Sequence, residues 1–69
     1  MSDLNVIVNG TPRRVPAPVT ARQLLDHLAL DPGGVVVEVN EHIIRRPQLE
    51  GTTLADGDRI EIVHFVGGG

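Results

Sequence analysis

Hydrophobic and polar residues alternate at the start of the chain. Leu4, Val6 and Val8 are separated by single residues, and this period of two predicts a strand that turns those three side chains toward a core. Asn9-Gly10 follows, and this pair is typical of a tight hairpin turn because both residues tolerate a positive φ. The returning strand is expected at about residues 13–15, where the flanking prolines suit only the edge of a sheet.

A helix is predicted after this hairpin. Thr20 is a suitable N-cap, and Gln23 three residues later completes the pattern of a capping box. Val19 precedes the cap and can form a hydrophobic staple with Leu24. The helical spacing of apolar residues predicts one buried stripe, made of Leu24, Leu25 and Leu28. We expect the helix to end at Asp31-Pro32-Gly33-Gly34.

The second half of the chain predicts further strands. A strand is expected over residues 35–40, with inward-facing valines at alternate positions, namely Val35, Val37 and Val39. A turn at Asn40-Glu41-His42 then leads into the short apolar pair Ile43-Ile44. Leu49 and Leu54 are isolated apolar residues in a connecting segment and are expected to fill the core.

The last predicted strand follows a turn signal, Asp56-Gly57-Asp58, and covers residues 59–65. Ile60 and Ile62 are expected to face the core, which places Val63 and Phe65 on the opposite face of the sheet. Phe65 has two interpretations at this point: it is an exposed anchor for a partner protein, or it covers the end of the core.

The predicted order is hairpin, helix, strand, short strand, long loop and strand. One helix can cover one face of a mixed sheet, because the helical stripe and the inward-facing strand residues then bury each other. This arrangement is an α+β fold of the β-grasp, or ubiquitin-like, type, with a mixed sheet of roughly four or five strands. In this fold the first and last strands are expected to be central and parallel. We assign residues 1–65 to the domain and residues 66–69 to a flexible C-terminal glycine tail.

The composition excludes several classes of chemistry and of partner. The chain has 69 residues, no cysteine and one aromatic residue, Phe65, and all of its basic side chains are arginines. The absence of cysteine excludes disulfides and thiolate chemistry, and the absence of lysine excludes side-chain amine chemistry. A net charge of −3 and the lack of stacking aromatics argue against nucleic acid as a partner. No segment resembles a signal peptide or a membrane span, so we expect a cytoplasmic protein without a membrane partner.

Candidate catalytic or metal-binding side chains are sparse. His27 and His42 are expected on the surface, and His64 is expected to pack at the end of a strand; their spacing does not suit a metal site. Asp56 and Asp58 flank a glycine, but the further oxygen ligands of a calcium loop are missing. Gly33-Gly34 precedes a strand rather than a helix and is therefore a turn rather than a phosphate cradle, and Arg45-Arg46 is an exposed pair that suits solvent or an acidic partner.

The sequence ends in Val66-Gly67-Gly68-Gly69. The glycines have no side chains, and three residues reach on the order of 10 Å, so they suit insertion into a narrow channel of another protein. We expect the carboxylate of Gly69 to be the reactive group. An ionised carboxylate is a poor acyl electrophile; adenylation with ATP activates it, and sulfur can then displace the adenylate to leave a thiocarboxylate.

The chain closely resembles the sulfur carrier proteins of thiamine biosynthesis, the ThiS family. The resemblance covers nearly the whole chain and rests on three segments: residues 6–10, residues 37–40 followed by Ile43-Ile44, and above all residues 56–69. Two departures are Glu41, where many relatives have glycine, and Arg45, where many have proline. Both are expected on the surface, where they affect which partner is recognised.

The resemblance implies that the chain is a protein cosubstrate rather than an enzyme. An E1-like, ThiF-like adenylyltransferase would adenylate Gly69 with ATP and Mg²⁺, and a cysteine desulfurase would supply the sulfur indirectly. A ThiG-like thiazole synthase would then take the sulfur for the thiazole ring, with Gly67 and Gly68 threading into its active site. Val63, Phe65 and Val66 are the candidate partner contacts.

Two alternatives share this terminal chemistry. One is the small subunit of molybdopterin synthase, although that family is usually longer and has a proline-rich approach to its Gly-Gly. The other is a ubiquitin-like protein modifier, which would form an amide with a target lysine.

Overall fold

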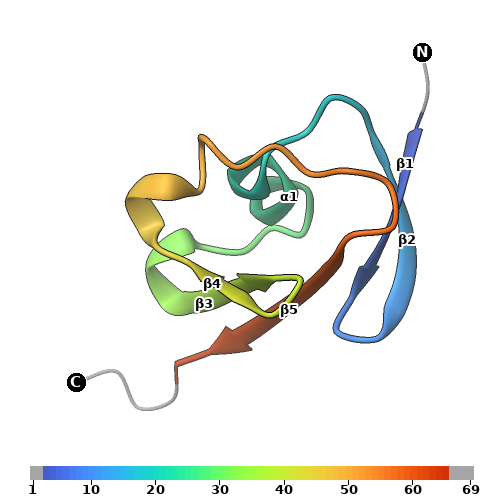
Figure 1. Cartoon of the computed structure of the whole chain (residues 1–69). Helices are drawn as coiled ribbons and strands as arrows, with labels where there is room; N and C mark the ends of the chain where they lie inside the picture. The colour runs from blue at the N-terminus through green and yellow to red at the C-terminus, as the bar shows by residue number, and fades with distance from the viewer. Residues whose placement is uncertain (1–2, 66–69) are drawn as a thin grey trace.

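The computed structural model describes residues 3–65, and they form one mixed sheet with one α-helix (Figure 1). The elements are, in chain order, β1 (Asp3–Val8), β2 (Thr11–Pro16), α1 (Ala21–His27), the 3₁₀ helix η1 (Pro32–Gly34), β3 (Val35–Val39), β4 (His42–Ile44), the 3₁₀ helix η2 (Arg46–Gln48) and β5 (Arg59–His64). The sheet has five strands in the order β2-β1-β5-β3-β4. Strands β1 and β5 are parallel and inner, as predicted, so the β-grasp fold is confirmed.

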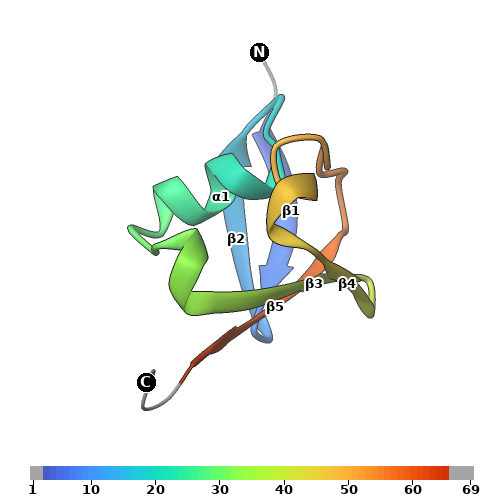
Figure 2. The ribbon, with the colours of Figure 1, turned by 90° about the vertical axis from the view of Figure 1, so that its left-hand side faces the viewer.

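The core lies between α1 and one face of the sheet (Figure 2). Leu24 and Leu25 of α1 are 1% and 0% exposed. The predicted inward-facing residues of the strands are buried with them, and so are Leu49 and Leu54; Leu4 and Leu28 are partly buried at the margin. This packing confirms the alternation predicted for β1, β3 and β5. No helix within the described residues 3–65 is long and apolar enough to cross a membrane.

The start of α1 is also confirmed. The Thr20 hydroxyl accepts a hydrogen bond from the Gln23 amide at 3.1 Å, and the Gln23 side chain accepts one from the Thr20 amide at 2.9 Å. These two bonds make the capping box and satisfy amide groups that have no partner within the helix. Val19 and Leu24, the predicted staple, are both 1% exposed.

The predicted end of the helix is wrong. Helix α1 ends at His27, and Ala29 takes a φ of +57°, whereas Asp31-Pro32-Gly33-Gly34 begins η1, with Asp31 as its N-cap. Asp31 accepts a hydrogen bond from the Gly33 amide at 2.8 Å, which stabilises this extra turn. The helix end was predicted wrongly because glycine is the usual residue at a left-handed helix end, whereas here an alanine occupies that position.

The boundaries of the strands differ less from the predictions. Strand β2 extends over Thr11–Pro16 and is longer than predicted, because its prolines lie on an edge strand whose outer side needs no ladder partner. Strand β3 ends at Val39 and β5 at His64, each one residue before the predicted end.

The turn between β3 and β4 is strained at Glu41. Asn40 and Glu41 take φ values of +50° and +71°, a region in which a side chain with a Cβ atom costs free energy. Glu41 is exposed, and it is the position at which the resemblance led us to expect glycine. The departure is therefore a surface change with an energetic cost to the turn.

The strain at Glu41 leads to a prediction about stability. Replacing Glu41 by glycine should raise the free energy of unfolding by about 0.5–1 kcal/mol, because relief of the left-handed strain exceeds the entropy that glycine adds to the unfolded chain. Urea denaturation measures the change. Glu41→Ala is the matched control, since it removes the same charge but keeps Cβ; an equal gain in both variants would show that charge, rather than strain, is the cause.

Candidate functional site

The candidate site is the end of β5, where the chain leaves the middle of the sheet. Strand β3 pairs antiparallel with β5 as far as Val35↔His64, and the Phe65 amide donates to the Gly34 carbonyl at 3.0 Å. The chain is therefore held to Phe65, its last described residue (Figure 1). Val66, Gly67, Gly68 and Gly69 lie outside the described residues, so their assigned roles and the domain boundary stay predictions.

Asn9 fixes the other side of β5. Its side-chain oxygen accepts from the Ile62 amide at 2.7 Å, and its side-chain nitrogen donates to the Ile62 carbonyl at 3.1 Å. The Asn9 amide also donates to the Ile60 carbonyl at 2.9 Å. One residue of the β1–β2 turn thus continues the sheet pairing beyond the end of β1, because parallel strands finish at the same end of a sheet. Sequence reasoning identified Asn9 only as a turn residue.

Exposed apolar side chains gather on the sheet face away from α1. Ile43, Val63 and Phe65 are 65%, 57% and 58% exposed, and Val36 is directly opposite Val63 in the β3–β5 register. This excludes the interpretation in which Phe65 covers the end of the core, because its ring is outside the core and open to solvent. Its role as an anchor for a partner stays a prediction. Large exposed apolar side chains in a group are typical of a surface that contacts another protein.

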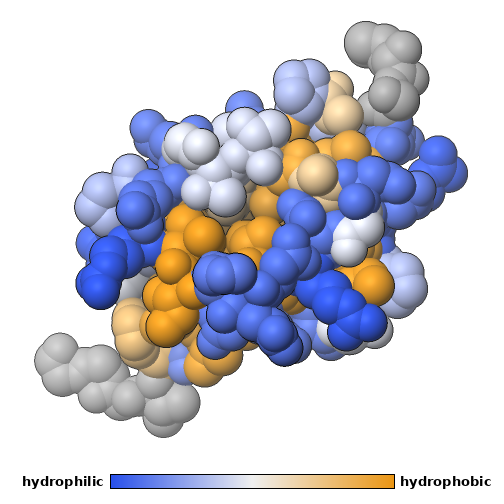
Figure 3. Space-filling view, in the orientation of Figure 1, coloured by the Kyte–Doolittle hydropathy of each residue, from blue (hydrophilic) through white to orange (hydrophobic). Residues whose placement is uncertain are grey.

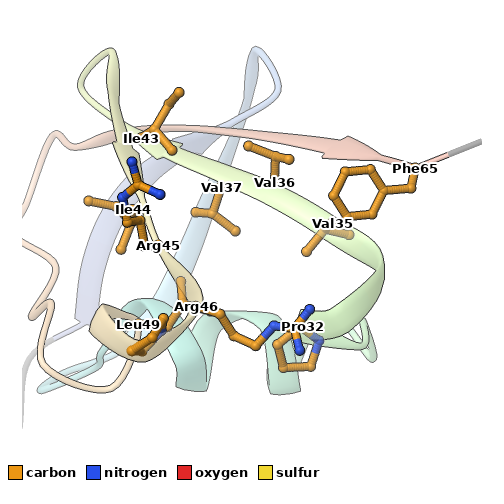
Figure 4. A pocket seen from close by; sticks show the side chains of 11 residues that line it. Pro32, Val35, Val36, Val37, Ile43, Ile44, Arg45, Arg46, Leu49 and Phe65 are labelled. Atoms are coloured by element: carbon orange, nitrogen blue, oxygen red, sulfur yellow. The ribbon is translucent and has the colours of Figure 1, made fainter.

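A groove of about 420 Å³ lies beside this face, along β3 and β4 (Figure 4). Strand β4 pairs only with Val37–Val39, so the first half of β3 has no strand partner on that side within residues 3–65. The groove extends along this gap, with Val35, Val37 and Leu49 among its apolar lining. Hydrophobic side chains reach the molecular surface in this region (Figure 3).

Two arginines border the groove. Their positive charge suits contact with an acidic partner. Arg45 and Arg46 are both exposed and both line it. The Arg46 side chain extends toward Pro32 (Figure 4), and its guanidinium lies so close to Gly33 that a Cβ added there would meet Nη2 at 3.6 Å. The groove therefore combines an apolar floor with a positively charged border, and sequence reasoning found only the arginine pair.

The remaining candidate side chains stay apart. His27 and His42 are exposed, as predicted, and Asp56 and Asp58 serve the turn by accepting from the amides of Asn5 and Ala55, both at 2.7 Å. His64, expected to pack, is exposed instead; it lies at the end of β5 and lines an open hollow together with Leu28 and Leu30. Within residues 3–65, no three potential metal ligands come together and no polar side chain is buried.

The described residues therefore form a β-grasp domain in which β5 ends beside an exposed apolar face. The ThiS family model matches residues 6–69, so the match includes the tail. The chain belongs to the ThiS family.

Individual relatives agree with this assignment. The chain is 46% identical over 50 residues to the sulfur carrier protein ThiS of Bacillus subtilis (strain 168), which is 72% of this chain and 76% of that protein. The crystal structure of a thiamine biosynthesis protein (ThiS) from Geobacter metallireducens is similar, with a TM-score of 0.82 and 35% identity over 96% of this chain and 100% of the other.

A larger relative contains a matching segment. A thiazole synthase of Paramagnetospirillum magneticum is 36% identical over 66 residues, which is 96% of this chain and 20% of that protein. The chain thus spans about a fifth of the length of this relative.

The contacts of Asn9 lead to a prediction about the end of β5. Asn9→Ala should lower the free energy of unfolding by about 2–4 kcal/mol, because it removes both side-chain hydrogen bonds and puts an alanine at a φ of +48°. It should also speed hydrogen exchange of the Ile62 amide. Asn9→Gly tolerates the φ but still lacks the bonds, so it should cost about 1 kcal/mol less. Unchanged exchange at Ile62 in both variants would contradict the role assigned to Asn9.

Proposed function

We propose that this protein is a sulfur carrier of thiamine biosynthesis that acts through the carboxylate of Gly69. The observation that carries the proposal is the ThiS family match, which continues through Gly69. The similarity to the Bacillus subtilis sulfur carrier protein ThiS supports it. The protein is then a cosubstrate, and the catalytic groups belong to the enzymes that it visits.

The proposed chemistry has two steps. A carboxylate oxygen of Gly69 attacks the α-phosphate of ATP in an E1-like, ThiF-like adenylyltransferase that uses Mg²⁺, and pyrophosphate leaves. In the second step a desulfurase persulfide, whose outer sulfur originates from cysteine, attacks the acyl carbon, and AMP leaves; a thiol reductant then cleaves the S–S bond of the resulting acyl disulfide and is itself oxidised. The resulting thiocarboxylate is a good nucleophile at neutral pH and donates its sulfur to the thiazole ring. Gly67 and Gly68 provide the side-chain-free approach to both active sites.

The proposed recipient is a ThiG-like thiazole synthase. The thiazole synthase of Paramagnetospirillum magneticum includes a segment that resembles nearly this whole chain, which supports a working association between such a domain and a synthase. The face formed by Ile43, Val63 and Phe65 lies beside the end of β5, so a partner that receives the tail also meets these side chains.

Intact mass spectrometry tests the proposal. The full chain, incubated with the adenylating enzyme, ATP and a sulfur source, should gain the mass difference between one sulfur and one oxygen atom, located at Gly69. A chain without Gly68 and Gly69 and a reaction without ATP are the controls. If no oxygen is exchanged for sulfur, the proposal is contradicted.

Two further experiments separate the sulfur carrier from the alternatives. If the protein restores growth without thiazole but does not restore molybdoenzyme activity, the molybdopterin synthase alternative is excluded. Conjugates on a denaturing gel would favour a protein modifier.

Phe65 should contribute to partner binding. Aromatic side chains at the centre of an interface often dominate its affinity, so Phe65→Ala should weaken association with the adenylating enzyme or the synthase about tenfold. Titration calorimetry measures the dissociation constant. The urea midpoint should change little, because the ring is 58% exposed. Thr11→Ala, at an exposed position on β2, is the control, and an unchanged affinity for both partners in Phe65→Ala would exclude Phe65 as an anchor.

A further inference from the structure

Two glutamates oppose each other at the centre of the sheet. Glu38 of β3 and Glu61 of β5 are directly paired in the antiparallel register. Their neighbours along each strand are buried beneath α1, namely Val37, Val39, Ile60 and Ile62. Successive strand residues point to opposite faces, so both carboxylates project from the face that α1 does not cover. Directly opposed residues of an antiparallel pair have Cβ atoms about 4.5–5.5 Å apart.

No basic side chain within residues 3–65 neutralises this pair. The ion pairs there are Arg14–Asp3 and Arg22–Asp26, and neither glutamate takes part in them. Arg59 faces the same side of the sheet two residues before Glu61, but it forms no ion pair with either glutamate. Like charges directly opposite one another destabilise a sheet. The isolated domain thus gains nothing from this arrangement.

Apolar side chains border the acidic pair. Val36 and Val63 form the pair two residues away in the same register, and Ile43 is directly opposite Glu38 on β4. Ile43 and Val36 lie on one side of β3 and Val37 on the other (Figure 4). The resulting surface, here named the open-face patch, consists of Val36, Glu38, Ile43, Glu61, Val63 and Phe65.

We propose that the open-face patch is a docking surface for thiazole synthase, in which Glu38 and Glu61 select a synthase surface that presents an arginine or lysine within an apolar contact. This inference rests on the proposed function, and the choice of partner is supported by the thiazole synthase that contains a segment resembling nearly this whole chain. An uncompensated acidic pair beside exposed apolar residues fits a partner that supplies the missing cation. The patch continues to Phe65, so the same contact directs the tail toward the synthase.

The two glutamates should destabilise the free protein but strengthen its binding to the synthase. Glu61→Gln relieves the repulsion in the free protein, so its urea midpoint should stay the same or rise. It also removes attraction in the complex, so the dissociation constant for thiazole synthase should increase about three- to tenfold at low ionic strength. This difference should shrink in high salt, because salt screens exposed charges. Glu38→Gln should behave alike, and the double variant should lose most of the salt dependence.

The test is calorimetric titration of purified synthase with the full chain and these variants, without ATP or a sulfur source. Glu50→Gln is the matched control: it removes the same charge from an exposed residue outside the patch and should leave the affinity unchanged.

Equal affinity of Glu61→Gln, Glu38→Gln and the unaltered chain at low salt would overturn the inference. So would an equal loss in Glu50→Gln, which would reduce the effect to net charge. The oxygen-for-sulfur exchange at Gly69 is measured separately on the unaltered chain. If the exchange fails, the proposed function fails; if the exchange succeeds and the glutamate variants bind normally, only this inference fails.

Discussion

The pairing of β5 between β1 and β3 is the interaction on which the rest of the structure depends. It joins the two ends of the described chain, since β1 begins at Asp3 and β5 ends at His64. Such non-local pairing carries a loop-closure cost that only the completed core offsets. Because β1 and β5 are parallel, the hairpin turn after β1 comes to lie beside the end of β5, and Asn9 can hold Ile62 there. The chain therefore leaves the sheet from its centre, between Asn9 and the start of β3.

A second constraint follows from size. Within residues 3–65 the one α-helix has seven residues and covers one face of the sheet, and Ile43, Val63 and Phe65 stay exposed on the other. An open face is common in sheets that contain antiparallel strands, and it is usually polar. Here that face presents Ile43, Val63 and Phe65 beside the charged side chains of Glu38 and Glu61. The topology explains why a face is open, whereas the residues on it explain why it suits contact with another protein.

Local chemistry predicted much of this fold. The capping box, the Asn9-Gly10 turn and the alternation in β3 and β5 each depend on residues close together in sequence, and each is present. The end of α1 was missed because the left-handed residue is Ala29, which has no sequence signal of that conformation. The length of β2 was missed because proline interrupts a central strand but not the outer side of an edge strand.

The site was less predictable for a different reason. Exposure of Val63 and Phe65 follows from alternation within one strand, so sequence reasoning reached it. The opposition of Glu38 and Glu61 depends on the register between β3 and β5, which a shift of one residue would abolish and which only the assembled sheet defines. The groove likewise depends on where β4 stops along β3. Contacts within a strand can be inferred from spacing, but contacts between strands require the register.

The proposed function places a particular demand on such a surface. A carrier that passes between an adenylating enzyme and a synthase must bind each partner and then leave it, so slow dissociation would limit its turnover. Charge complementarity mainly accelerates association and improves selectivity, whereas extensive apolar burial mainly slows dissociation. A small apolar surface with an acidic pair therefore suits repeated encounters better than a larger apolar surface would. On this reasoning the repulsion between Glu38 and Glu61 persists because its benefit lies in the complex rather than in the free domain.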